Sequence, residues 1–374
     1  MKVFFSVWYW MLLSFVFAQS GEQEWLQQAD RSYDAKNYAA ALPAYQQAYQ
    51  LNKNNETTIY RILFSQNELK QYDDALNFLY SLPLPTIVNN ENIAEEFRYS
   101  AQHSTLYDKS IKLLKEAAVQ KPYEYKYLSS IANTYSNAKR YADAASMFSI
   151  LDDKTEPGKL DYENWCYSLN ELKRHEEAVS LGKKAIGKYK DYAPLYNETG
   201  YACKEINKPG DAKYYFNKAL ALDSTSASAW RYLGEVCKDL GDDDNVEQAI
   251  QCFNKVIELN KATASTYYNL GWCYNETEDF DFAENYLRKS IDMDSTSGNS
   301  YLELGYAQYK QKKYADAITN FKKTAELNSQ SELAHYYAGL TYYMQKDQYN
   351  LRREYDQLKS MNSTEADKLE KYLK

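Results

Sequence analysis

The chain has 374 residues, of which 44% are hydrophobic and 26% are charged, so it can bury a core and carries an ordinary share of charge. Its formal net charge is −8 and its pI is about 5.2. Nucleic-acid affinity comes mainly from Lys and Arg displacing phosphate counterions, so an acidic chain without a basic run is not expected to bind nucleic acid. The 12 Gly and 7 Pro are too few for a turn-rich β protein. The 39 Tyr favour helix interfaces that are partly exposed to water, because Tyr buries a ring and keeps a polar tip.

Residues 1–18 predict a signal peptide. Lys2 supplies a positive charge, the stretch from Val3 to Phe17 is almost entirely apolar, and cleavage is expected between Ala18 and Gln19. The apolar run is shorter than the roughly 20 residues of a membrane span, although an uncleaved anchor is the alternative. We therefore expect an exported protein without an integral membrane segment after cleavage. The expected location is a bacterial periplasm or cell envelope, or otherwise the extracellular space.

A period of about 34 residues runs through the rest of the chain. Its first marker, mostly a small residue ahead of an amphipathic second helix, stands at Ala41, Ala75, Ser110, Ala144, Ala178, Ala212, Ala249, Ala283, Ala317 and Leu351. A second marker, usually twelve residues earlier, stands at Ala29, Leu63, Arg98, Ala132, Cys166, Gly200, Gly234, Gly271, Gly305 and Gly339. Both columns keep steps of 34 residues except for one step of 35 and one of 37. Two columns that share one period indicate ten tandem helix-turn-helix units.

The units follow one another along the chain with two insertions. Repeats 1 and 2 occupy 19–90, a degenerate repeat 3 occupies 91–124, repeats 4–10 occupy 125–365, and a capping helix is predicted at 366–374. Pro83 and Pro85 predict a joint before repeat 3, because Pro disfavours helix for itself and its predecessor. The extra residues near Asp242–Asp244 predict a longer turn inside repeat 7.

The residues between the markers resemble a known repeat. Each of three first helices has an aromatic residue followed by Leu-Gly: Trp230 with Leu233-Gly234, Tyr267 with Leu270-Gly271, and Tyr301 with Leu304-Gly305. This pattern resembles the tetratricopeptide repeat. The resemblance covers about residues 22–365 and implies an all-α, right-handed α-solenoid of stacked repeats. The Pro that ends each repeat in that family is mostly replaced here, and nearby Asn, Asp or Ser residues are expected to cap the next helix instead.

Catalytic and metal-binding constellations are not found in the sequence. His103, His175 and His335 fall in three different repeats without an acid or thiol at matching spacing, so a structural role is favoured. The five Cys (Cys166, Cys203, Cys237, Cys252 and Cys273) are interpreted as small buried thiols, although a link between Cys252 and Cys237 or Cys273 stays open. We expect no enzyme activity, no cofactor and no metal.

The resemblance implies a partner-binding groove lined by the first helices. The predicted groove residues are Tyr167, Asn170, Asn197, Tyr201, Lys204, Arg231, Lys238, Tyr268, Trp272, Asn275, Tyr306 and Tyr309. Rigid rings combined with hydrogen-bonding and cationic groups are typical of binding surfaces. The alternative explanation for any single tyrosine in this set is that Tyr is simply abundant in the chain and the position has no binding role.

Three functions are compatible with this pattern. The first hypothesis is an exported scaffold or adaptor that binds one or more proteins, or extended peptide segments, along several repeats. The second is a glycan-binding module, in which rings grouped in one pocket would stack on sugar faces. The third is an enzyme, which would need converging titratable groups, such as Glu235 with another acid.

Overall fold

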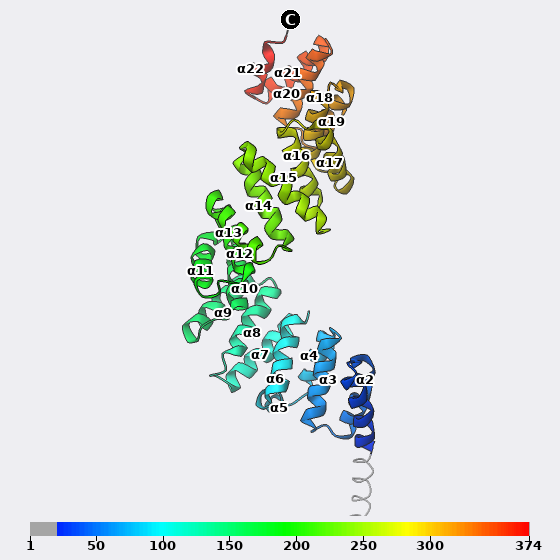
Figure 1. Ribbon diagram of the computed structural model, residues 1–374, viewed down its shortest axis with the longest axis vertical. Coiled ribbons are helices and arrows are strands. Elements are labelled where there is room, and N and C mark those ends of the chain that lie inside the picture. The colour runs from blue at the N-terminus through cyan, green and yellow to red at the C-terminus, as the bar shows by residue number, and fades with distance from the viewer. Residues whose placement is uncertain (1–20, 374) are drawn as a thin grey trace, which may run out of the picture. The chain divides into compact units, whose positions relative to one another are not determined.

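A computed structural model describes residues 21–373 of the chain, so the predicted leader at 1–18 lies outside the described residues. Between residues 21 and 373 the chain forms helices joined by short turns and no β-strand (Figure 1). This confirms the predicted all-α architecture of stacked helix-turn-helix units. The chain divides into two compact units, Met1–Leu181 (unit 1) and Gly182–Lys374 (unit 2), and each is described by itself.

Unit 1 begins with a helical segment at residues 21–34. Its further helices are α2 (Tyr38–Leu51), α3 (Glu56–Glu68), α4 (Tyr72–Tyr80), α5 (Leu84–Asn89), α6 (Glu91–His103), α7 (Tyr107–Gln120), α8 (Lys126–Asn137), α9 (Tyr141–Lys154) and α10 (Lys159–Glu171). The boundary between the units falls within α11 (His175–Lys188). Unit 1 therefore holds repeats 1–4 and most of repeat 5.

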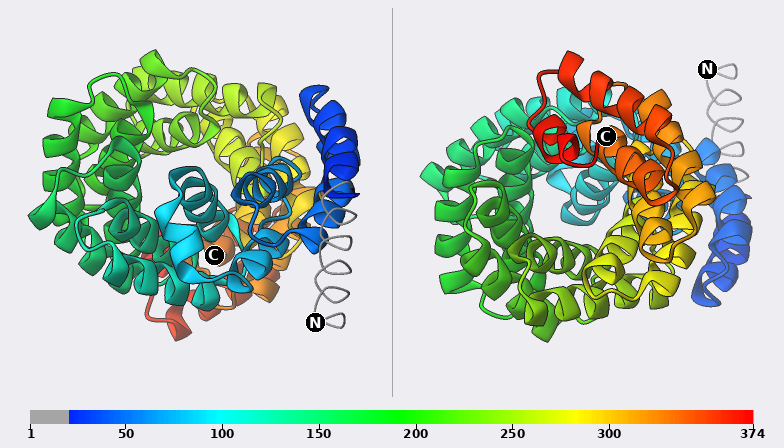
Figure 2. Two further views of the ribbon diagram at one scale, coloured as in Figure 1. Left: turned by 90° about the horizontal axis from the view of Figure 1, so that it is seen from below. Right: turned by 90° about the horizontal axis from the view of Figure 1, so that it is seen from above.

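Unit 2 contains the more regular repeats. Its helices are α12 (Ala193–Glu205), α13 (Pro209–Leu222), α14 (Ala227–Leu240), α15 (Asp243–Glu258), α16 (Ala264–Glu276), α17 (Phe280–Met293), α18 (Gly298–Lys310), α19 (Tyr314–Leu327), α20 (Glu332–Met344), α21 (Gln348–Ser360) and α22 (Glu365–Glu370). Each helix lies beside the helices that precede and follow it, as the end views show (Figure 2). The first helix of each repeat is even-numbered here, and the second is odd-numbered.

Small residues at the predicted marker positions allow the two helices of a repeat to approach closely. A Cβ atom added at Gly305 would lie 2.6 Å from Cε1 of Phe321, and one at Gly234 would lie 2.8 Å from the same atom of Phe253. Real Cβ atoms do not come so near, so the large side chain of the second helix fills the space that a larger residue would occupy. The periodic small residues are therefore explained by sterics at the helix crossing.

Polar residues cap the first helices where the related pattern has Pro. Asn55, Ser226, Thr263 and Ser297 are N-cap residues whose side chains accept a hydrogen bond from the backbone N–H three residues later. Such caps satisfy backbone donors that the helix itself leaves unpaired. The predicted replacement of the repeat-end Pro by capping residues is confirmed at these positions.

The turn between the two helices of a repeat contains a left-handed residue. Non-glycine residues with φ between 55° and 64° recur there at Lys36, Lys70, Lys139, Lys173, Asn207, Glu278, Lys312 and Lys346. In repeat 7, Gly241 takes this conformation with φ 73° and ends α14. The extra residues near Asp242–Asp244 do not lengthen the turn as predicted. Asp242 caps α15, and Asp243 and Asp244 form its first turn, where acidic residues are favoured by the helix dipole.

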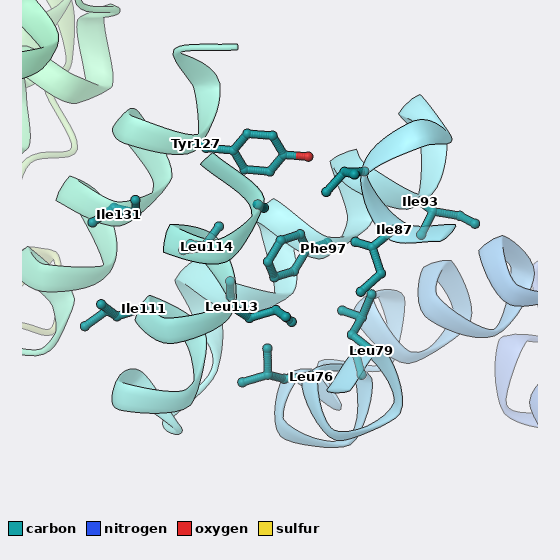
Figure 3. Close-up of a cluster of buried hydrophobic side chains, with 14 of the residues drawn as sticks. Leu76, Leu79, Ile87, Ile93, Phe97, Ile111, Leu113, Leu114, Tyr127 and Ile131 are labelled. Carbon is teal, nitrogen blue, oxygen red and sulfur yellow. The ribbon is translucent and has the colours of Figure 1, made fainter. Parts of the chain in front are cut away.

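The degenerate repeat 3 lies on a dense apolar cluster in unit 1. Phe97 of α6 lies at the centre of this cluster, with Leu113 and Leu114 on one side and Leu79 and Ile87 on the other (Figure 3). The joint predicted from the two Pro residues is the short helix α5, which begins directly after Pro83. This inserted helix contributes Ile87 to the cluster. The segment that departs from the repeat pattern is therefore packed into the apolar core of unit 1.

Two further features belong to unit 2. Four rings form a ladder between α16 and α17: Phe282 on Tyr274, Tyr274 on Tyr286, and Tyr286 on Tyr267, with interplanar angles of 26°, 4° and 15°. At the end of the unit, Leu369 of α22 packs against Gly339 of α20. Helix α22 thus covers the last repeat, as a capping helix should. It ends at Glu370, whereas the predicted cap extended to residue 374, which is not described.

The helix crossing in repeat 9 can be tested with two glycines of unit 2. We expect Gly305→Ala to lower the free energy of unfolding by about 1–3 kcal/mol, because the added methyl group displaces Phe321. The matched control is Gly210→Ala in α13, where a Cβ meets nothing within 4 Å and Ala has the higher helix propensity. Urea unfolding followed by circular dichroism measures both variants. Equal midpoints for the two would contradict the steric explanation.

Candidate functional site

Ten of the twelve predicted groove residues lie on the first helices of unit 2. They come from α12, α14, α16 and α18 and occupy corresponding positions in successive repeats. Within one helix they are three, four or seven residues apart, so they share one side of it. We call this side of α12, α14, α16 and α18 the first-helix face of unit 2.

Glu235 connects two cations on this face, Arg231 and Lys204. Its carboxylate accepts a hydrogen bond from Arg231 Nη1 at 3.1 Å and lies 3.3 Å from Lys204 Nζ, which also pairs with Glu205. The Arg231 guanidinium lies 4.1 Å from the ring centre of Tyr232. Burial alone would lower the pKa of Lys204, but Glu235 and Glu205 outweigh it and raise that pKa. The lysine therefore stays charged, and Glu235 faces cations rather than a second acid.

Trp272 is half-buried, so its indole is not the freely exposed ring that a groove position suggests. The ammonium group of Lys238 lies 5.2 Å from its ring centre, within the range of a cation–π contact. Lys238 also lies 3.7 Å from Asp239 Oδ1. Because Lys238 comes from α14 and Trp272 from α16, this contact joins two successive repeats.

Asn275 is 3% exposed, and its amide ties α16 to α18. Its Nδ2 donates to the backbone carbonyl of Glu303 at 3.1 Å and to Glu303 Oε2 at 2.8 Å. Unit 1 contains the same arrangement between Asn67 and Glu96, at 3.2 and 2.7 Å. Burial raises the pKa of Glu303, and burial with the nearby Glu303 raises the pKa of Tyr268 to about 12. Asn275 is thus first a connector between repeats, although its Oδ1 accepts no hydrogen bond within residues 21–373.

The tyrosines of the last predicted positions pack against neighbouring rings. Tyr306 meets the ring of Phe280 edge-on at 6.4 Å, and Tyr309 lies 6.2 Å from Tyr314. The edge-on pair between the start of a second helix and the following first helix recurs in unit 1: Tyr38 with Phe64, Tyr72 with Tyr99, and Tyr141 with Tyr167. Many of the tyrosines therefore serve contacts between repeats.

The remaining predicted residues are less closely connected. Asn197 donates weakly to Glu198 at 3.5 Å, and the Tyr201 ring lies 5.0 Å from Tyr232. Tyr167 and Asn170 belong to α10 in unit 1, where the Tyr167 side chain is 38% exposed and Asn170 is buried within 3.4 Å of His175. The structure thus joins some predicted residues, such as Lys204 with Arg231 through Glu235 and Lys238 with Trp272, and places others against residues outside the predicted set.

Sequence reasoning does not single out two residues of this face, Tyr232 and Glu303, whereas it does point to Glu235. Glu235 stands at the same position in its repeat as Tyr201 and Trp272, so the register that selected those residues also points to Glu235. Glu303 and Tyr232 stand beside the selected column. Their contacts with predicted residues, Tyr232 with Tyr201 and Glu303 with Asn275, are seen only in the structure.

Cavities adjoin first helices in both units. One of about 340 Å³ in unit 2 is lined in part by Arg231. Another of about 660 Å³ in unit 1 is lined by residues of α6, α8, the ends of α9 and α10, and the turns between them. The described residues contain no group of three His, Cys, Asp or Glu side chains that could hold a metal ion. Within the same residues no helix is both long and apolar enough to cross a bilayer.

The five cysteines are all buried, and none forms a disulfide, as interpreted from the sequence. Burial raises the pKa of the thiols of Cys252 and Cys273 to about 12. The thiolate is the reactive form of cysteine, so these groups are poor nucleophiles. His335, expected to lack an acidic partner, instead lies 2.7 Å from Glu354 of α21.

Comparisons with known proteins identify the repeat. Profiles of the tetratricopeptide repeat match residues 224–296 and 302–348. The C-terminal part of a TPR repeat-containing protein from Cytophaga hutchinsonii superposes with a TM-score of 0.51 and 18% identity, covering 66% of this chain and 99% of that one. At this identity the likeness concerns the fold alone.

Two curated proteins are similar in sequence to part of this chain. The human protein O-mannosyl-transferase TMTC3 is 25% identical over 206 residues, which are 51% of this chain and 22% of that protein. The probable UDP-N-acetylglucosamine–peptide N-acetylglucosaminyltransferase SPINDLY of Hordeum vulgare is 26% identical over 163 residues, which are 41% of this chain and 16% of that protein. The chain therefore spans about a fifth of the length of these relatives.

The buried Glu303 gives unit 2 a testable pH dependence. Its pKa is raised in the folded chain, so its stabilising contribution is complete below the unfolded pKa and is lost as pH rises through the folded pKa. We expect Glu303→Gln, which keeps an acceptor for Asn275, to raise Tm at pH 7.5 by about 2–4 °C. The difference should shrink as pH falls toward 4.5, because protonation of the wild-type carboxyl removes the cost of burying its charge. Thermal melts at both pH values measure it, with the exposed Glu247→Gln as the control; a difference independent of pH would refute the assignment.

Proposed function

Because the chain is a tetratricopeptide repeat protein, we propose that it is an exported, non-enzymatic scaffold or adaptor that binds other proteins. The proposed ligand is an extended segment of the partner, lying along the first-helix face of unit 2. Stacked repeats support such binding because they present equivalent positions at regular intervals over a long surface.

The observation that carries the proposal is the composition of this face. Within one row across α12, α14, α16 and α18 stand Tyr201, Glu235, Trp272 and Tyr306, flanked by Lys204 and Lys238. Tyr, Trp and Arg are enriched at the energetic centres of protein interfaces, and Arg231 lies on the same face as these rings. Their spread over four repeats suits an extended segment better than a compact ligand.

The contacts within the face also favour binding. Arg231, Lys204 and Lys238 are already held by Glu235, Tyr232 and Trp272. Side chains that are fixed before binding lose less conformational entropy when a partner arrives. Each of these cations retains N–H groups that can donate to main-chain carbonyls of a bound segment.

Glycan binding is the second candidate. The observation that favours it is a group of tyrosines, Tyr99, Tyr123 and Tyr125, around the 660 Å³ cavity of unit 1. Rings grouped in one pocket could stack on sugar faces. We rank this candidate lower because the rings of the first-helix face are spread along successive repeats, whereas a sugar site needs rings grouped in one pocket.

The scaffold proposal predicts a partner that depends on the first-helix face. A crosslinked pull-down from cells that make the protein compares wild type with Trp272→Ala/Arg231→Glu. We expect one or a few proteins to be captured by wild type and lost with the double variant, because both substitutions remove contacts on the face and one reverses its charge. Circular dichroism must show that the variant is folded, and Arg231→Glu alone is a milder alternative to replacing the half-buried indole.

The matched control is Tyr349→Ala/Arg353→Glu, which makes the same kinds of change on exposed positions of α21. Capture that persists in both double variants would place binding elsewhere on the chain. Retention of polysaccharide without protein would favour the glycan candidate.

Export rests on the sequence of residues 1–18. The prediction is that the mature protein begins at Gln19, because a signal peptidase cleaves after small residues such as Ala18. Intact-mass measurement of protein isolated from its natural host, together with cell fractionation, tests this. An intact Met1 in the mature protein would argue for the uncleaved anchor.

A further inference from the structure

The cavity of about 660 Å³ in unit 1 lies at the repeat that departs furthest from the pattern. Arg98 of α6 occupies the position where most other repeats carry a small residue, and it lines this cavity. The side chain of Arg98 is 9% exposed and forms ion pairs with Glu91 at 3.2 Å and Glu124 at 3.5 Å. A guanidinium therefore replaces the helix-crossing contact and forms part of the cavity wall.

One donor of this guanidinium is unused. Nη1 of Arg98 is buried and makes no hydrogen bond within residues 21–373, although the carboxylate of Glu124 neutralises it at 3.5 Å. A buried N–H group without an acceptor is costly, so the site gains by receiving an oxygen atom. A main-chain carbonyl of a bound peptide supplies such an acceptor without adding a third negative charge beside Glu91 and Glu124.

Aromatic rings are exposed at the same cavity. Tyr123, in the turn before α8, is 87% exposed, and Tyr99 of α6 is 46% exposed. Unit 1 already uses tyrosine faces to hold cations: the Arg61 guanidinium lies 3.8 Å from the ring centre of Tyr33, and the Lys109 ammonium 4.6 Å from that of Tyr80. Unlike those rings, Tyr123 holds no cation from the described part of its own chain.

The charge of the lining is negative. Glu95, Glu124, Glu156 and Asp161 face two cations, Arg98 and Lys126. Lys126 pairs with Glu91 at 3.1 Å, and Arg98 pairs with Glu91 and Glu124. The carboxylate of Glu95 has no cationic partner within residues 21–373. The cavity thus attracts a positive group and disfavours an anion.

We propose that this cavity is a second binding site, which takes a Lys or Arg side chain from an extended, basic segment of a partner protein. The cation lies against Tyr123 and Tyr99 with Glu95 as its counter-charge, while Arg98 donates to the main chain of the segment. This inference deepens the proposed scaffold function and rests on it, but it concerns unit 1 rather than the first-helix face of unit 2.

The test uses a fluorescein-labelled twelve-residue Gly-Ser peptide with three Arg residues, and a matched peptide with citrulline in their place. Citrulline has nearly the shape of Arg without its charge. We expect the Arg peptide to bind the full chain roughly tenfold more tightly at low salt and to weaken as salt rises. Fluorescence anisotropy measures both peptides.

Two double variants locate the binding. Glu95→Gln/Tyr123→Ala should weaken the Arg peptide roughly tenfold, because it removes a counter-charge and an exposed ring. Glu247→Gln/Tyr349→Ala makes the same changes at exposed positions of unit 2 and should leave binding unchanged. Both pairs lie at the surface, and thermal melts verify folding.

Equal affinity for the Arg and citrulline peptides overturns the proposal, as does equal weakening by the two double variants. Displacement of the Arg peptide by a neutral oligosaccharide such as cellohexaose also overturns it, in favour of a sugar site. The two proposals fail separately. The Arg peptide can bind as expected while both double variants of unit 2 still capture the same proteins in the pull-down. The scaffold proposal then fails for unit 2, and the cavity assignment stands. If the pull-down succeeds and the Arg peptide shows no preference, only the cavity assignment fails.

Discussion

The fold depends on one steric constraint, the contact between a residue without a large side chain on a first helix and a large side chain on the second. Gly305 under Phe321 and Gly234 under Phe253 show it most directly. This contact fixes how closely the two helices of a repeat approach and therefore which sides of them remain for other contacts. Since both helices of a repeat bury only one side in this way, their other sides must pack on the next repeat. The regular first-helix face of unit 2 is a consequence of that packing.

Polar and aromatic contacts then join one repeat to the next. The amide of Asn275 reaches both the backbone and the side chain of Glu303, and Asn67 does the same with Glu96. Such buried bonds are directional, so they fix the alignment of successive first helices more narrowly than apolar packing can. The same contacts explain why tyrosine is so common: its ring packs edge-on between repeats, as Tyr141 and Tyr167 do, and its hydroxyl remains near water.

The sequence predicted the fold more fully than it predicted the site. The repeat period and the column of small residues indicated helix pairs, because those features reflect contacts within one repeat. The groove residues contact side chains about one repeat away in the sequence. A pattern within one repeat does not identify those partners. Asn275 could be selected as a polar residue on the right side of its helix, but its bond to Glu303 could not. For the same reason His335 was expected to lack the acidic partner that Glu354 provides, and the aspartates after Gly241 were assigned to a turn although two of them begin a helix. Whether the groove residues bind a partner remains a prediction.

The ring ladder between α16 and α17 has a spectroscopic consequence. Tyr267, Tyr286 and Tyr274 are stacked nearly parallel, with 15° and 4° between successive ring planes. Parallel rings held at fixed separations couple their electronic transitions, so the ladder contributes a circular dichroism signal in the near ultraviolet. That signal requires fixed tertiary packing and vanishes when helices persist but their packing loosens. The protein thus carries an intrinsic optical reporter of tertiary packing, to which the contact between α16 and α17 contributes and which the mere presence of helix does not produce.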